Sequence, residues 1–299
     1  MTLKSLRNKE AKTAWLFISP ALLHLAAFAI YPLVFAFVIS LYHWNLLNGQ
    51  HHYIGAENYR FAFHEAPFGN ALWNSFLFTI LSVPIGMAMG LAAALLVSQT
   101  LKGVTIFRTI YYIPAISSGV ATSIMWIYVY LPENGLVNTV FSYFHIYNKT
   151  DFLHDARFAL LALVFMSTIT GLGPRMILYL SGLVNIPPSL YEAAAIDGAT
   201  GFTSFRKITL PMLTPTTLFV IVTSTIGAMQ VFTPVYMMTQ GGPEGKTDLV
   251  GYHIYTEAWQ NFATGLASAK SFVLLAVILG MTLLQFKFVK GGMEGYEAR

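Results

Sequence analysis

One short segment of the sequence has nearly the spacing of a phosphate-binding loop. The segment Gly241–Thr247 reads GGPEGKT and ends in the Gly-Lys-Thr triplet with which such loops hold phosphate. The full pattern needs another glycine five residues before that triplet, where this chain has Gln240. The segment also follows an apolar, helix-like stretch and not a strand. We therefore expect no nucleotide site and no cofactor in this chain.

Histidine and acidic residues are the other candidates for chemistry. His51 and His52, with His64 and Glu65, could bind a metal, but no predicted span places them on one face, so we expect solvated loop residues and no metal site. No Ser-His-Asp order suggests nucleophilic catalysis. All 13 acidic residues lie outside the hydrophobic centres. A proton-driven carrier usually needs buried acids, so that carrier and a membrane-embedded enzyme are both disfavoured.

Two cations fall inside apolar segments. Arg175 lies near the middle of its segment, where an arginine costs about 2.5 to 3.5 kcal/mol on insertion scales. It should therefore face protein or water, and its partners could be carbonyls freed by Pro174, a second subunit or a solute. Lys270 lies near an outer end and could snorkel to the interface. If both cations line a pathway, the solute is anionic, such as a uronate oligosaccharide or a glycerol phosphate.

The elements that position these residues must be membrane-spanning helices. Of the 299 residues, 56% are hydrophobic and only 10% are charged, whereas a soluble domain carries roughly 25% charged residues. The basic balance is therefore better explained by membrane orientation than by nucleic-acid binding. The chain has no cysteine, which excludes disulfides.

Six apolar stretches are long enough to cross a bilayer core, which takes about 20 residues. They run over Ala14 to Leu41, Leu72 to Val97, Ile106 to Leu131, Phe158 to Val184, Leu213 to Met238 and Leu266 to Val289. The first is too long for a cleaved signal peptide, and we expect an uncleaved anchor. The spans contain prolines and other small residues, which indicates either kinks within a bundle or helices shaped to line a pathway.

Lysine and arginine predict the orientation of these spans. With the N-terminus inside, 11 of the 17 Lys and Arg residues fall on the inner side and four on the outer side. Such an excess of positive charge marks the cytoplasmic side. Both termini and the segment between spans four and five are therefore predicted to be cytoplasmic.

The cytoplasmic segment 186–215 predicts two short helices. Ser189 and Glu192 have the spacing of a capping box at the start of a helix over Leu190 to Ile196. Asp197-Gly198 should end that helix, because glycine can adopt the left-handed conformation. A second helix over about Thr203 to Thr209 should be closed by Pro211. The segment could be a surface turn on the membrane interface or a docking surface.

The same segment resembles the EAA signature of ATP-binding-cassette (ABC) importer permeases. The matching residues are Glu192, Ala193, Ala194, Asp197, Gly198, Ala199, Phe205, Ile208, Leu210, Pro211 and Pro215. Further matches to the carbohydrate-uptake permeases are Ile54-Gly55, Glu57-Asn58-Tyr59, Phe107-Arg108-Thr109, Pro114 and the Thr239–Pro243 loop. That last loop is typical of the MalF-like half of a permease pair, and the resemblance runs from about residue 12 to 290.

The resemblance implies an all-α integral membrane protein with six transmembrane helices and the type I ABC importer (MetI-like) permease fold. Residues 1–13 and 291–299 would be cytoplasmic ends, and residues 14–290 the permease domain. Its partners would be a MalG-like second permease, two ATPase subunits and an extracytoplasmic binding protein that delivers carbohydrate. The protein would lie in a bacterial inner membrane, and ATP hydrolysis would belong to the ATPase subunits, so this chain would not be an enzyme.

The resemblance also assigns roles to residues. The ATPase-coupling residues would be Glu192, Ala193, Ala194, Asp197, Gly198, Ala199 and Phe205, and the solute-pathway residues Ser118, Gly171, Arg175, Ser224 and Gln230. Ile169 and Thr233 depart from the family pattern, which leaves the sugar contacts open. The alternatives are an importer of an anionic solute and, from another class, a membrane enzyme or sensor. An enzyme or sensor would need a catalytic cluster or an appended domain, and the sequence shows neither.

Overall fold

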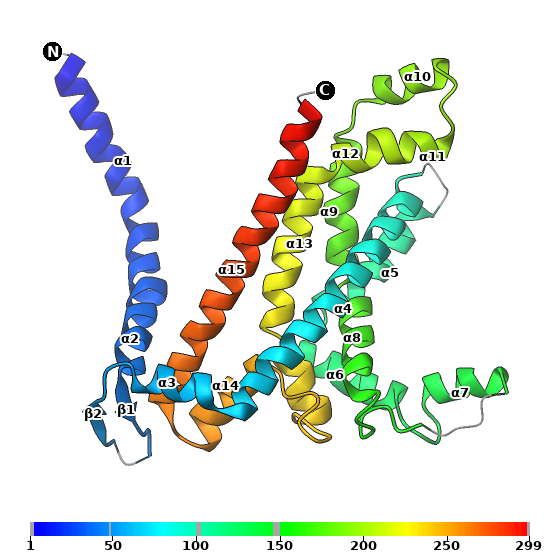
Figure 1. The fold of residues 1–299 in the computed structure, drawn as a ribbon. Helices are drawn as coiled ribbons and strands as arrows, with labels where there is room; N and C mark the ends of the chain where they lie inside the picture. Colours follow the sequence, from blue (N-terminus) through cyan, green and yellow to red (C-terminus); the bar gives the residue numbers. More distant parts are fainter. Residues whose placement is uncertain (1–2, 48, 100–102, 146–149, 298–299) are drawn as a thin grey trace. The chain divides into compact units, whose positions relative to one another are not determined.

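The computed structural model describes residues 3–47, 49–99, 103–145 and 150–297, and the helices and strands among these residues are all helices except for one two-stranded hairpin (Figure 1). The chain forms two compact units. Unit 1 comprises Met1–His64 and Ile254–Val273, and unit 2 comprises Glu65–His253 and Leu274–Arg299.

Unit 1 begins with one long helical stretch. It consists of α1 (Leu3–Leu25), the π-helix η1 (Ala26–Ile30) and α2 (Tyr31–Ser40). Its apolar part, Thr13–Ser40, has a mean hydropathy of 2.3, and none of its most apolar window is buried within the structure. This stretch agrees with the first predicted span.

The segment of unit 1 that follows α2 contains structure that the sequence did not predict. Strand β1 (Tyr42–Trp44) pairs antiparallel with β2 (His51–Tyr53), and α3 (Glu57–His64) follows. The buried Asn58 side chain fixes α3 to the preceding chain, because its Nδ2 donates to the Ser40 carbonyl at 2.8 Å and to the Tyr42 carbonyl at 2.9 Å.

The second segment of unit 1 joins the end of α14 (Val250–Tyr255), the π-helix η4 (Thr256–Gln260) and the start of α15 (Thr264–Glu297). Thr264 Oγ1 donates to the Trp44 carbonyl at 3.0 Å. Helix α15 continues past the predicted end of the sixth span.

Unit 2 is built around α4 (Ala66–Val97), which packs along α8, α9 and α13. Its other elements are α5 (Val104–Ile116), α6 (Gly119–Val129), α7 (Leu136–Tyr143), α8 (Ala159–Thr170), α9 (Leu172–Val184), α10 (Pro188–Ile196), α11 (Gly201–Ser204), η2 (Phe205–Thr209), α12 (Leu210–Met212), α13 (Thr214–Met229) and η3 (Val235–Thr239). Ala94, Met176, Leu213 and Val220 are buried at their common core. Within this unit, α10 and α11 lie at one end of the helices and α7 at the other (Figure 1).

Three predicted spans are not single straight helices. The third is broken at Ser117–Ser118, where α5 and α6 meet at 103°, and the fourth bends by 46° at Gly171. The fifth ends its α-helix at Met229, well before the predicted Met238. Among the described residues, three helices are long and apolar enough to span a membrane, or up to six when each bent pair counts as one span.

Candidate functional site

Unit 2 contains a cavity of about 710 Å³ between α4, α5, α6, α8, α9 and α13. Its polar lining side chains are Ser82, Ser117, Thr122, Ser167, Thr170, Arg175, Thr223 and Ser224. Among the described residues that line it, there is no carboxylate and no second cation. The cavity is therefore rich in hydroxyl groups and carries one positive charge.

Two helix breaks, one between α5 and α6 and one between α8 and α9, lie in the wall of the cavity. The α5–α6 break at Ser117 and the α8–α9 bend at Gly171 both lie in the lining. Pro114 precedes the first break and Pro174 follows the second, and proline removes a backbone donor that a continuous helix needs. Broken helices are tolerated at membrane depth where they line a cavity or are covered by protein.

Arg175 lies in the first turn of α9 and reaches into this region. Its Nε donates to Ser224 Oγ on α13 at 3.2 Å. Its Nη1 is buried and has no hydrogen-bond partner among the described residues. No ion pair of Arg175 with a carboxylate is present in that part of the chain, so the positive charge is not neutralised there.

Glycines surround the Arg175 side chain. A Cβ on Gly86 or on Gly171 would lie 2.6 Å from Nη1, and a Cβ on Gly90 would lie 2.7 Å from the Arg175 Cβ. Real Cβ atoms essentially never come so close. The glycines therefore create the recess that the arginine occupies.

The structure brings three of the five predicted pathway residues together. Gly171, Arg175 and Ser224 line the cavity, whereas Ser118 and Gln230 do not. Ser117 and Gly119, the neighbours of Ser118, line it instead, because the α5–α6 break turns the chain at this point. The pathway role of all five stays a prediction.

The contribution of α4 was missed from the sequence. Ser82, Gly86 and Gly90 recur at four-residue intervals, which places them on one helix face. Small residues at this spacing allow close approach between membrane helices. That spacing could have identified α4 as the wall behind Arg175.

Lys270 has a different environment, within unit 1. Its side chain is fully buried, and its Nζ donates to Glu257 Oε2 at 2.7 Å. The expectation that Lys270 could snorkel to the interface is therefore wrong. Glu257 precedes α15 in the chain and supplies the counter-charge, so Lys270 is paired within its own unit.

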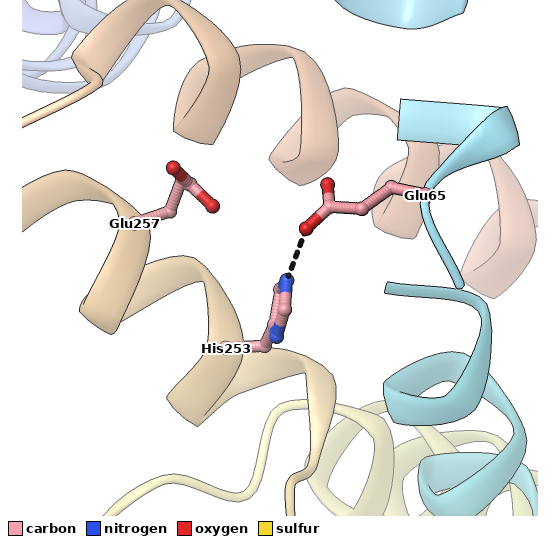
Figure 2. A group of neighbouring side chains, drawn as sticks. All are labelled: Glu65, His253 and Glu257. Carbon is pink, nitrogen blue, oxygen red and sulfur yellow. Dashed lines mark ion pairs between the residues drawn. The ribbon is translucent and has the colours of Figure 1, made fainter. Parts of the chain in front are cut away.

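The loop after α13 is fastened to the start of α4. His253 Nδ1 lies 2.9 Å from Asp248 Oδ2, and Nε2 lies 3.8 Å from Glu65 Oε1. Figure 2 shows the His253 ring between helices with its edge toward the Glu65 carboxylate. Asn74 Nδ2 donates to the Gly245 carbonyl at 2.8 Å, and Ser75 Oγ accepts from Val250 N at 2.8 Å. The segment Gly241–Thr247, which resembles a phosphate-binding loop in sequence, therefore helps to hold the loop after α13 against α4.

The second candidate site is the exposed loop formed by α10, α11 and η2. Helix α10 ends with a Schellman motif, in which Ala199 N donates to the Ala194 carbonyl and Gly198 N to the Ala195 carbonyl. Gly198 has a φ of +75°, so the prediction that glycine ends this helix in the left-handed conformation is confirmed.

Other details of the loop differ from the predictions. Helix α10 begins at Pro188, Pro187 is its N-cap, and Ser189 makes no capping hydrogen bond. Proline suits the first helical position because its missing N–H needs no partner there, and this moves Ser189 inside the first turn. Pro211 does not close the second helix, which continues through η2 and α12. The π-helix η2 directly precedes this segment, and its wider turns suit a position where proline lacks a backbone N–H.

The loop is anchored on one side and exposed on the other. The hydroxyls of Tyr191 and Thr209 lie 2.9 Å apart and join α10 to η2, and Tyr191 packs against the core. Ile196 is 87% exposed and Phe202 is 73% exposed. Of the predicted coupling residues, Glu192, Ala193, Asp197 and Gly198 are exposed, while Ala194, Ala199 and Phe205 are partly buried.

Comparison with known proteins identifies the group to which this arrangement belongs. The family described as binding-protein-dependent transport system inner membrane component matches residues 82–290. A probable ABC transporter permease protein of Bacillus subtilis (strain 168), YesP, is 32% identical over 94% of this chain and 91% of its own length. The lactose transport system permease protein LacF of Rhizobium radiobacter is 32% identical over 94% of this chain and 95% of its own length.

Solved structures have the same fold. A bacterial alginate ABC transporter in complex with an alginate pentasaccharide-bound periplasmic protein contains a chain with a TM-score of 0.82 and 23% identity. The match covers 95% of this chain and 97% of that one. This likeness confirms the predicted importer-permease fold.

Proposed function

The chain belongs to the family of binding-protein-dependent transport system inner membrane components, and on this premise we propose that it is a carbohydrate permease subunit of an ABC importer. With a second, MalG-like permease it forms the path for an oligosaccharide that an extracytoplasmic binding protein delivers. Two ATPase subunits drive the transport, and the membrane is the bacterial inner membrane. Relatives named for lactose and for arabinooligosaccharides support the carbohydrate assignment.

The observation that carries the proposal is the exposed, internally capped loop from α10 to η2. Ile196 and Phe202 are large apolar side chains that this loop leaves exposed, and exposed apolar surface is a feature of interaction sites. The ATPase subunit docks there through Glu192, Ala193, Ala194, Asp197, Gly198, Ala199 and Phe205. The loop and both chain termini lie on the cytoplasmic side in this proposal.

The cavity around Arg175 is the solute-pathway segment of the same proposal. Its volume of about 710 Å³ falls within the usual range of about 300 to 1,000 Å³ for ligand sites. Its serine and threonine hydroxyls can donate to and accept from sugar hydroxyls.

The test is reconstitution in proteoliposomes with the second permease, the ATPase subunits and the binding protein. We expect ATP hydrolysis to rise when the binding protein is loaded with a carbohydrate. No rise with any carbohydrate would contradict the proposal.

A variant of Gly198 isolates the coupling step. Gly198→Asp adds a Cβ at a backbone φ of +75° and a second carboxylate beside Asp197. It should assemble and hydrolyse ATP at the basal rate but lose the stimulation and the uptake. Gly201→Ala is the matched control, because its Cβ would also meet nothing within 4 Å while its φ is not positive. Equal loss in both variants would mean that the loop merely tolerates no substitution.

A further inference from the structure

The charge on Arg175 has no counter-charge among the described residues. Its Nη1 is buried without a partner, its Nε is held by Ser224, and no carboxylate lines the cavity. Removing a charge from water is costly unless the charge is paired. The missing interaction can come from a second subunit or from a molecule that enters the cavity.

The recess around Arg175 is built for this side chain. Gly86 on α4 and Gly171 at the α8–α9 bend both leave out the Cβ that would collide with Nη1. Nη1 lies against both glycine positions and Nε is bonded to Ser224, so Nη2 is the nitrogen that has neither constraint. The guanidinium is therefore fixed at two of its three nitrogens.

A second polar group in the same wall lacks a partner. The Ser82 side chain lies one turn before Gly86 on α4 and lines the cavity. Ser82 is only 2% exposed, and its Oγ has no hydrogen-bond partner among the described residues. A buried hydroxyl without a partner is destabilising, so Ser82 and Arg175 together mark a polar subsite.

We propose that the transported solute is an acidic carbohydrate whose carboxylate pairs with Arg175, while Ser82 bonds a neighbouring polar group of the same solute. This inference rests on the proposed permease function and specifies its substrate class. The lining holds one cation, which balances one carboxylate group of the solute and would leave a dianionic phosphate group only half neutralised. A charge-assisted hydrogen bond from a guanidinium nitrogen to a carboxylate is roughly twice as strong as a neutral one.

The experiment is uptake by the assembled importer in proteoliposomes, with three probes. Trigalacturonate carries carboxylates, its methyl ester has the same rings without the charge, and glycerol 3-phosphate carries a phosphate. Each is tested with the wild-type chain, Arg175→Gln and Arg175→Lys. The binding protein is the same in every arm, so the ratio of variant to wild type reports on the permease alone.

We expect the wild type to import trigalacturonate, and Arg175→Gln to import it at least about tenfold more slowly, because a hydrogen-bonded charge pair is lost. Arg175→Lys should retain part of the activity, since it keeps the charge but not the planar fork. Subunit assembly should not change, and uptake of the methyl ester should fall much less than uptake of trigalacturonate in both variants.

Four results would overturn the inference. They are wild-type uptake of the ester without trigalacturonate, unchanged trigalacturonate uptake by Arg175→Gln, preferred uptake of glycerol 3-phosphate, and failure of Arg175→Gln to assemble with the second permease. The last result would assign the counter-charge to the partner subunit. Wild-type uptake of the uncharged methyl ester alone would contradict the acidic substrate and still support the permease function. No uptake of any probe, together with no stimulated ATP hydrolysis, would contradict both the acidic substrate and the permease function.

Discussion

Lys270 and Arg175 are both cations within candidate membrane spans, but their charges are balanced differently. Lys270 is fully buried in unit 1 and bonds Glu257 at 2.7 Å. Arg175 lines a cavity in unit 2 and donates to a serine, and one of its buried nitrogens has no partner in the part of the chain that the structure describes. Burial alone therefore does not identify a functional cation. The informative property is whether the same chain also supplies the counter-charge.

The largest expected effect is on stability and concerns the paired cation. Lys270→Met should lower the free energy of unfolding by about 3 to 5 kcal/mol, because it leaves the Glu257 carboxylate buried and unpaired. Thermal unfolding of the purified chain in detergent measures this change.

The matched variants for that prediction are Arg175→Met and the double variant Glu257→Leu with Lys270→Met. Arg175→Met leaves no carboxylate unpaired and should lose much less stability. The double variant should recover most of the loss. Equal destabilisation by Arg175→Met and Lys270→Met would show that the two cations have the same structural role.

The next effect is on transport and concerns the recess behind Arg175. Gly86→Ala puts a Cβ 2.6 Å from Nη1, so the flexible end of the arginine must move while the helix accepts alanine well. We expect uptake of the solute to fall about tenfold, which corresponds to about 1.4 kcal/mol. Gly227→Ala is the control, because Gly227 lines the same cavity and its Cβ would meet nothing within 4 Å. Equal uptake by the two variants would refute the importance of the recess.

A smaller effect is expected at the hydrogen bond that orients the guanidinium. Ser224→Ala removes the acceptor of Arg175 Nε and should slow uptake roughly three- to tenfold, in line with about 1 kcal/mol for a hydrogen bond. Thr223→Ala removes a neighbouring hydroxyl that already bonds the Phe219 carbonyl of its own helix, and it should have little effect. If the two variants slowed uptake alike, the contact between Arg175 and Ser224 would have no special role.

The smallest effect concerns an exposed ion pair outside the spans. The Arg157 guanidinium hydrogen-bonds Asp155 at 2.7 Å and lowers the pKa of that carboxyl from 3.8 to about 2. A lowered pKa stabilises the folded state above about pH 4, and this contribution is lost as the pH falls toward 2. Because the pair is exposed, that contribution is small, and Arg157→Ala should lower the unfolding midpoint only slightly between pH 5 and pH 8 and not at all near pH 2. A loss comparable to that of Lys270→Met would contradict the distinction between exposed and buried pairs.

Local patterns in the sequence predicted the features that depend on neighbouring residues. The apolar stretches and the left-handed Gly198 are examples, since hydropathy and a glycine stop act over a few residues. The capping box at Ser189 failed because Pro188 is better placed to begin the helix. Two local signals, the capping box at Ser189 and the proline Pro188, therefore competed for the start of this helix, and the proline determined it.

Features that join distant segments were not predicted. Glu257 and Lys270 lie 13 residues apart across a turn, and Ser82, Gly86 and Arg175 meet only when α4 packs along α9. Arg175 itself was recognised as costly at membrane depth. Its glycine recess and its missing counter-charge needed the packed structure.

The most direct test of the account is the thermal unfolding midpoint of the assembled importer, without the binding protein, in the presence and absence of trigalacturonate. A ligand that binds the folded state raises the midpoint by mass action. We predict a rise for the wild type with trigalacturonate, none with its methyl ester, and none for Arg175→Gln. An unchanged wild-type midpoint, or the same rise in Arg175→Gln, would contradict the claim that the solute supplies the counter-charge of Arg175.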